Sequence, residues 1–184
     1  AVDVTVMAAH RLAAAAAATA AAYCLWKLVV RPAYRWHIGR SIVRSWPHGV
    51  EVRTSRLRGA GLGLFARRDF APGERLGAYH GRVLSLLQAH LLENRDYLMG
   101  GFGVNTHVDA RFAMSSEGRY VNDNFDPACL NAKFVKDKAE KKAQLVATRT
   151  IRKGEEIYAS YGEHYWRARG IDPRTGGPLP PTTK

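Results

Sequence analysis

Three polar segments of this chain carry residues that could bind and orient a reacting ligand. They are the glycine run Gly61–Gly63, the turn Arg119–Asp126, and the stretch Gly154–Trp166. Glycines let a backbone approach a ligand closely and adopt positive φ values. The side chain of Asn122, in the second segment, offers donors and an acceptor together, which suits a zwitterionic ligand.

Tyr161, in the third segment, is the residue best suited to orient reacting groups. A phenol has a pKa near 10, so it stays protonated at neutral pH and does not compete as a nucleophile. Such a group serves a reaction that needs alignment and removal of water more than acid–base strength. Each segment alone is also typical of ordinary structure: a turn around the glycines or Asn122, and a half-buried strand at Tyr161.

The elements that must position these residues are predicted to be short strands separated by turns. Strands are expected at Val50–Val52, Leu62–Ala66, Arg75–Tyr79, Val108–Arg111, Arg119–Val121 and Glu156–Ser160. A hairpin is expected between Ala132–Val135 and Gln144–Ala147. The best helix candidate is Val83–Leu98, where Leu84, Leu87, Leu91 and Leu92 would share one face. The chain lacks βαβ alternation, which argues against a doubly wound nucleotide-binding fold.

Composition places the chain among globular proteins with a basic surface. Its 184 residues have room for one domain and a short appendage, and the formal net charge is +12. This charge suits nucleic acid, chromatin or an anionic membrane as a partner, or it serves solubility alone. Cys24 and Cys129 are too few and too far apart for a zinc cluster or a disulfide framework, so no metal is expected.

Residues 1–46 differ in composition from the rest and are interpreted as an Ala/Arg-rich extension. No Asp or Glu occurs between Val4 and Val50, and Ala13–Ala22 is almost all alanine. Three interpretations stay open: a helical or disordered low-complexity extension, an organelle transit peptide, and a membrane anchor over Leu12–Val30. Lys27 and the alanine content count against the anchor. Residues 47–166 are assigned to the domain and residues 167–184 to a loose tail.

The three segments together resemble the SET-domain protein lysine methyltransferases. The string GLGLFARRDFAPGERL, which begins at Gly61, is similar to the first SET motif, and Gly154–Trp166 is similar to the closing G-E-E-L-x-x-x-Y-G motif with its nearby Tyr-Trp pair. Arg119–Asn124 resembles the R-F-x-N-H-S motif, with Asn122 kept and Asp123 where His is usual. The chain lacks flanking cysteine clusters, so it resembles the compact members of the family.

The resemblance implies a mainly β fold with short helices. In the family this fold is a β-clip of small curled sheets, and the C-terminal segment passes under an earlier loop in a pseudoknot-like threading. The threading would bring Asn122 and Tyr161 together, although they are far apart in the sequence. Such threading is rare among proteins and is expected here from the family alone.

The resemblance also implies S-adenosylmethionine as the cofactor, without a metal. The residues nominated to bind the cofactor are Leu62, Gly63, Asn122, Asp123 and Trp166. Tyr161 matches the catalytic tyrosine of the family. Tyr97 is expected to line the lysine channel or the cofactor pocket, and Tyr79 and Phe102 compete with it for that place.

The implied reaction is methylation of a lysine in a protein, taken to be a histone lysine in the nucleus. Two alternatives stay open: a non-histone protein of an organelle as substrate, and a catalytically silent SET fold that binds a peptide or chromatin. The second alternative is favoured by Asp123 in place of His. Glu155 and Glu156, with Asp123 and Asp126, could supply acidity around the ligand site. The favoured interpretation is that Glu155 and Glu156 are solvated charges of a turn.

Overall fold

The computed structural model describes residues 18–25, 28 and 45–180. The chain divides into two units after residue 42, and each is described by itself. In the first unit residues 18–25 are helical and exposed. Within the described ranges no helix is long and apolar enough to cross a membrane. The transit-peptide and anchor interpretations depend mainly on residues 1–17, 26–27 and 29–44, which lie outside the described residues, as do residues 181–184.

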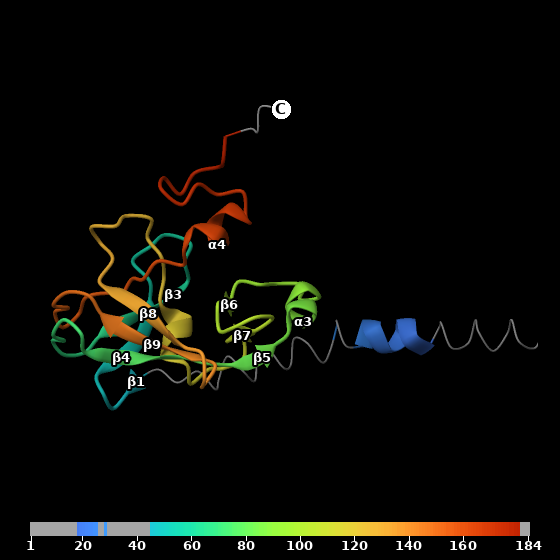
Figure 1. Cartoon of the computed structure of the whole chain (residues 1–184), viewed down its shortest axis with the longest axis horizontal. Coiled ribbons are helices and arrows are strands. Elements are labelled where there is room, and N and C mark those ends of the chain that lie inside the picture. The colour runs from blue at the N-terminus through green and yellow to red at the C-terminus, as the bar shows by residue number, and fades with distance from the viewer. Residues whose placement is uncertain (1–17, 26–27, 29–44, 181–184) are drawn as a thin grey trace, which may run out of the picture. The chain divides into compact units, whose positions relative to one another are not determined.

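The second unit, as far as it is described, contains three small antiparallel sheets of three strands each (Figure 1). The first has the order β1 (Ser45–Trp46), β2 (Val50–Thr54), β3 (Leu62–Ala66). The second has the order β4 (Arg75–Tyr79), β9 (Lys142–Ala147), β8 (Ala132–Asp137). The third has the order β5 (Arg82–Leu84), β7 (His107–Asp109), β6 (Leu98–Gly100). The helical elements are α3 (Leu86–His90), the 3-10 helix η2 (Glu117–Tyr120) and α4 (Glu163–Arg167). The predicted mainly β fold with short helices is confirmed.

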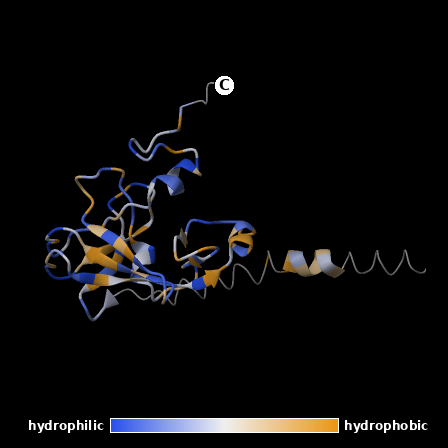
Figure 2. Cartoon of the chain, in the orientation of Figure 1, coloured by the Kyte–Doolittle hydropathy of each residue, from blue (hydrophilic) through white to orange (hydrophobic). Residues whose placement is uncertain are grey.

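Burial along the strands explains why these segments pair. In β9 the alternate residues Ala143, Leu145 and Ala147 are buried, as the two-residue period of a half-buried strand requires. Four consecutive residues are buried in both β3 and β4, which is typical of strands covered on both faces. Figure 2 shows hydrophobic residues in the strands of the β4-β9-β8 sheet, whereas α4 is hydrophilic.

The predicted hairpin is confirmed and is longer than expected. Its strands pair from Ala132 with Ala147 to Asp137 with Lys142. The predicted strand at Val108–Arg111 is shifted by one residue at its start and forms β7.

The helix predicted over Val83–Leu98 is wrong over most of its length. Only Leu86–His90 is helical, and β5 and β6 occupy its two ends. Ser85 begins α3 with a capping box, in which its hydroxyl accepts from the Gln88 N–H and the Gln88 side chain accepts from the Ser85 N–H. Leu84 is buried in β5, while Leu87 is 68% exposed. The leucines at helical spacing therefore do not share one buried face.

Two other predicted strands near the site are also wrong. Arg119–Val121 does not form a strand, because η2 covers Glu117–Tyr120. Glu156–Ser160 forms isolated bridges in place of a continuous strand: Glu156 pairs with Phe65, and Tyr158 pairs in parallel with Asn122.

The segment Glu156–Ala159 connects two parts of the fold. The Ile157 N–H donates to the Leu64 carbonyl of β3 at 2.8 Å, and the Ala159 N–H donates to the Asn122 carbonyl at 3.0 Å. The segment is thus bonded to β3 and to the Asn122 turn at once. This arrangement places Tyr161, two residues further on, beside that turn.

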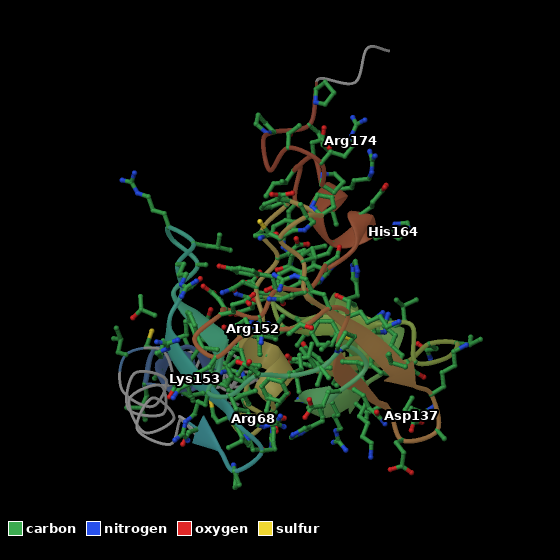
Figure 3. All side chains as sticks on the ribbon, turned by 90° about the vertical axis from the view of Figure 1, so that its left-hand side faces the viewer. Arg68, Asp137, Arg152, Lys153, His164 and Arg174 are labelled. Atoms are coloured by element: carbon green, nitrogen blue, oxygen red, sulfur yellow. The ribbon has the colours of Figure 1, made fainter. Side chains whose placement is uncertain are left out.

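Residues 170–179 form a hydrogen-bonded loop, which is more order than their Pro- and Gly-rich composition indicates. The Asp172 N–H donates to Gly177, and the Leu179 N–H donates to Gly170, each at 2.8 Å. Figure 3 shows Arg174 of this loop and His164 of α4 at the end of the unit opposite Asp137, where β8 ends.

Candidate active site

Tyr161 lies between the Glu156–Ala159 segment and α4, and its hydroxyl donates to the Val121 carbonyl at 2.8 Å. This hydrogen bond holds the phenol against Val121, the residue just before Asn122. Burial raises the pKa of the Tyr161 phenol, and Tyr165 and Asp123 act in the same direction. The phenol is therefore neutral at physiological pH; its proton is directed at the Val121 carbonyl, and its oxygen can accept a further hydrogen bond.

Asn122 joins the first and third segments of the sequence. Its side-chain amide donates to the Leu62 carbonyl at 3.0 Å and to the Glu156 carboxylate at 3.3 Å. Leu62 begins β3, and Glu156 begins the segment that leads to Tyr161. The structure therefore brings residues of all three segments to one place.

Glu156 is a buried carboxylate at the centre of this arrangement, so its interpretation as a solvated turn charge is wrong. The residue is 2% exposed. One oxygen accepts from the Ser55 hydroxyl at 2.6 Å and from the Asn122 amide. The other oxygen accepts from the Arg56 N–H at 2.7 Å and from the Tyr158 hydroxyl at 2.8 Å. These donors compensate for the loss of water around the charge.

Glu155, the other acid of that turn, is half-buried at the surface. Its carboxylate pairs with the exposed Arg149 guanidinium at 2.9 Å.

Gly63 leaves the space that Glu156 occupies. A Cβ at position 63 would overlap the Glu156 Oε1 atom. A glycine is thus required by packing in the structure as described, whatever part Gly63 also has in ligand binding. The sequence shows the glycine, but it does not show that Glu156 lies beside it.

Asp123 is 9% exposed and connects the Asn122 turn to the residues around α4. Its Oδ2 atom accepts from the Tyr161 backbone N–H and from the Trp166 indole N–H, both at 2.8 Å. Its Oδ1 atom accepts from the Phe125 N–H at 3.1 Å.

An aromatic cluster surrounds this carboxylate. The Trp166 ring is stacked on the Tyr161 ring with centroids 5.5 Å apart and an interplanar angle of 14°. Phe125 lies 4.4 Å from Trp166, and the Tyr165 ring stands edge-on to both Tyr161 and Trp166 at 4.8 Å.

Two adjoining clefts open at these residues. The first has a volume of about 390 Å³, and the second has a volume of about 290 Å³. Asp123, Phe125 and Trp166 line the first cleft only, whereas Leu62, Tyr97 and Arg119 line the second only. The residues that line both are Ala60, Asn122 and Tyr161.

A family model of the SET domain matches residues 61–162, which begin at the glycine run and end just after Tyr161. The chain belongs to the SET-domain family. Its SET domain thus extends from the predicted first motif to the predicted closing motif.

Two relatives with assigned activities each match more than half of the chain. Human histone-lysine N-methyltransferase EHMT1 is 28% identical over 131 residues, which are 67% of this chain and 10% of that protein. The H3 lysine-4 specific histone-lysine N-methyltransferase of Cryptococcus neoformans is 32% identical over 125 residues, or 61% of this chain and 8% of that protein. The matched part is thus a tenth or less of each relative, so these are likenesses between domains.

The residues nominated from the sequence differ in whether they line a cleft. Leu62, Asn122, Asp123 and Trp166 line a cleft, and Gly63 is not among the lining residues. Among the three competing aromatics, Tyr97 lines a cleft, while Tyr79 and Phe102 belong to a buried apolar cluster. The roles of these residues toward a ligand remain predictions.

Arg119 of the SET domain is a cleft residue that the sequence interpretation did not nominate. Its guanidinium donates to the carbonyls of Ala110 and Arg111, each at 3.0 Å, and lies over the Tyr97 ring at 4.6 Å. The signal was present, since Arg119 begins the R-Y-V-N motif. Only the structure shows that its charge borders a cleft.

Proposed function

We propose that this SET domain transfers a methyl group from S-adenosylmethionine to a lysine side chain of a protein. The observation that carries the proposal is that Asn122 and Tyr161 line both of two adjoining clefts. Such a pair of clefts suits two ligands that must react with each other. The two relatives are named histone-lysine methyltransferases, which supports a histone lysine as the acceptor.

The residues of the clefts fit this cofactor. The Trp166 and Phe125 rings of the first cleft offer apolar faces for a purine, and the Asn122 amide, which lines both clefts, offers a polar partner for an amino acid group. No ion pair within residues 45–180 includes the buried carboxylates of Asp123 and Glu156. Asp123 lines the first cleft, and its negative charge, which has no ion-pair partner there, favours a cationic ligand. When bound, S-adenosylmethionine supplies an electrophilic methyl group on a positively charged sulfur.

The protein's contribution is to present a neutral amine in line with that methyl group. A lysine has a pKa of about 10.4, so nearly all of it is charged at neutral pH. Tyr97 and Tyr161 provide an aromatic wall that disfavours the charged form and lowers the pKa of the lysine. The Tyr161 hydroxyl stays protonated, so it orients the reacting groups and does not act as the base.

A methyl-transfer assay with labelled S-adenosylmethionine and core histones tests the proposal. We expect label on a histone lysine, and Tyr161→Phe should lower the rate by about a hundredfold because the orienting hydroxyl is lost. Calorimetry should show that the variant still binds the cofactor. Tyr165→Phe is the comparison variant: Tyr165 also lines the second cleft, but its hydroxyl makes only an exposed bond of 3.4 Å to Asp96.

The outcomes also separate the alternatives. No label on histones, with the cofactor still bound, would redirect the proposal from chromatin and the nucleus to a non-histone substrate of an organelle. Neither label nor cofactor binding would overturn it in favour of a silent SET fold that binds a peptide or chromatin. Full activity in Tyr161→Phe would contradict the role given to that hydroxyl.

A further inference from the structure

Both oxygens of the Asp123 carboxylate accept hydrogen bonds from the protein. Oδ2 accepts two N–H groups, one from the Tyr161 backbone and one from the Trp166 indole, and Oδ1 accepts the Phe125 N–H. Hydrogen bonds to an ionised acceptor are stronger than those between neutral groups. The 2.8 Å distances at Oδ2 fit that class.

The C-terminal helix needs such an anchor, because burial does not hold it. α4 has five residues, none of which is buried, and its N-cap Gly162 makes no side-chain capping bond. Its other polar links to the domain run from Tyr165 and Arg169 to Asp96, at 3.4 and 3.2 Å, and both are exposed. The shortest of these side-chain hydrogen bonds is therefore the one from the Trp166 indole to Asp123, at 2.8 Å.

We propose that Asp123 is a positioning residue that assembles the first cleft. Its carboxylate holds the plane of the Trp166 indole and the backbone of Tyr161 against the Asn122 turn. One acceptor atom serves both donors, so the wall of the cleft and the approach to the Tyr161 hydroxyl are set together. The inference rests on the proposed function only for the identity of the ligand in the cleft.

Two substitutions distinguish the hydrogen bonds of the Asp123 carboxylate from the contribution of its side chain to packing. Asp123→Ala removes both oxygens. Asp123→Asn keeps the volume and one oxygen, but its NH2 group must face the donors of one oxygen, so it loses one bond in one orientation and two in the other. We expect the effect of Asp123→Asn to be in the same direction as that of Asp123→Ala and smaller.

The indole N–H of Trp166 gives a readout that needs no ligand. In a ¹H–¹⁵N spectrum of the ¹⁵N-labelled full chain, Trp166→Phe identifies this resonance among those of the four tryptophans. Asp123→Ala should make its exchange with water at least about tenfold faster, since a charge-assisted hydrogen bond is lost. The other indole resonances should not move, and their movement would indicate general unfolding. A Trp166 resonance that Asp123→Ala and Asp123→Asn leave unchanged would overturn the inference.

Calorimetric binding of S-adenosylmethionine tests the consequence for the cleft. Asp123→Ala should raise Kd about tenfold, and the same change in a Trp166→Phe background should raise it by about threefold or less, because the shared bond is already gone. Asp126→Ala is the matched control, since this exposed acid of the same turn bonds only within it, and its Kd should stay within about twofold. A full tenfold effect in the Trp166→Phe background would contradict the coupling. A native chain that binds no S-adenosylmethionine would overturn the proposed function, and the indole exchange would still decide the role of Asp123.

Discussion

The Asn122 amide donates to the Glu156 carboxylate at 3.3 Å and joins two segments that are 34 residues apart in the chain. Glu156 also accepts from Ser55 and Arg56, which lie about a hundred residues before it. One buried carboxylate therefore connects the loop after β2, the Asn122 turn and the segment that leads to Tyr161.

Removing the Glu156 carboxylate should destabilise the domain. Glu156→Ala leaves buried donors without an acceptor, so we expect the free energy of unfolding to fall by about 3 kcal/mol. Urea denaturation measures this change. Glu155→Ala is the control, because the half-buried Glu155 pairs with an exposed arginine and should contribute about 1 kcal/mol or less. Equal losses of unfolding free energy for the two variants would contradict the central structural role given to the Glu156 carboxylate.

Gly63→Ala should disturb the same carboxylate from the other side. The added Cβ overlaps Glu156 Oε1, so Glu156 must move away from Asn122. We expect a loss of about 2 kcal/mol in unfolding free energy, as for other overpacked sites, together with weaker binding of S-adenosylmethionine. A Cβ at Gly59 meets nothing within 4 Å, and the φ there is +82°. Gly59→Ala should thus cost about 1–2 kcal/mol from the backbone alone and leave cofactor affinity unchanged.

Stability should fall at high pH because the fold raises the pKa of several tyrosines, with Tyr79, Tyr158 and Tyr161 among them. Burial raises the pKa of Tyr79 and of Tyr161 in the folded protein, while the unfolded chain releases these protons near pH 10. The free energy of unfolding should thus be insensitive to these groups below pH 10. Above pH 10 it should drop by about 1.4 kcal/mol per pH unit for each tyrosine. Urea denaturation at pH 9 to 11 measures how steeply the free energy of unfolding falls with pH. Tyr161→Phe should reduce this slope by the contribution of one tyrosine. An unchanged slope would show that Tyr161 ionises normally.

Asp123→His, which installs the residue usual in the family, should weaken the site in this chain. A neutral imidazole has one acceptor nitrogen, whereas the Asp123 carboxylate accepts three N–H groups. We expect about a tenfold loss in affinity for S-adenosylmethionine, measured by calorimetry, with a lower rate of methyl transfer. A gain of activity would instead support the silent-fold alternative, in which Asp123 is what disables the enzyme.

The main features of the fold were predictable where local pattern and tertiary structure agree. The hairpin of β8 and β9 has alternating burial in β9 and a charged turn, so its sequence indicates its structure. The leucines around α3 show the opposite case. Their helical spacing indicated a long helix, but Leu84 is buried as part of β5 and Leu87 is exposed, because sheet pairing with β7 outweighs helix propensity there.

Residue types and their order along the chain determined the family, the mainly β fold and the candidates Asn122, Tyr161 and Trp166. Only the tertiary structure decided that Glu156 is buried and that Asp123 holds Trp166. Both acids occur in turn-like sequences, where a solvated charge is the usual outcome. A carboxylate can leave water only when donors replace it, and here those donors include the Trp166 indole, 43 positions from Asp123, and Ser55 and Arg56, about a hundred positions from Glu156. No local pattern contains that information, because it arises when distant segments are brought together.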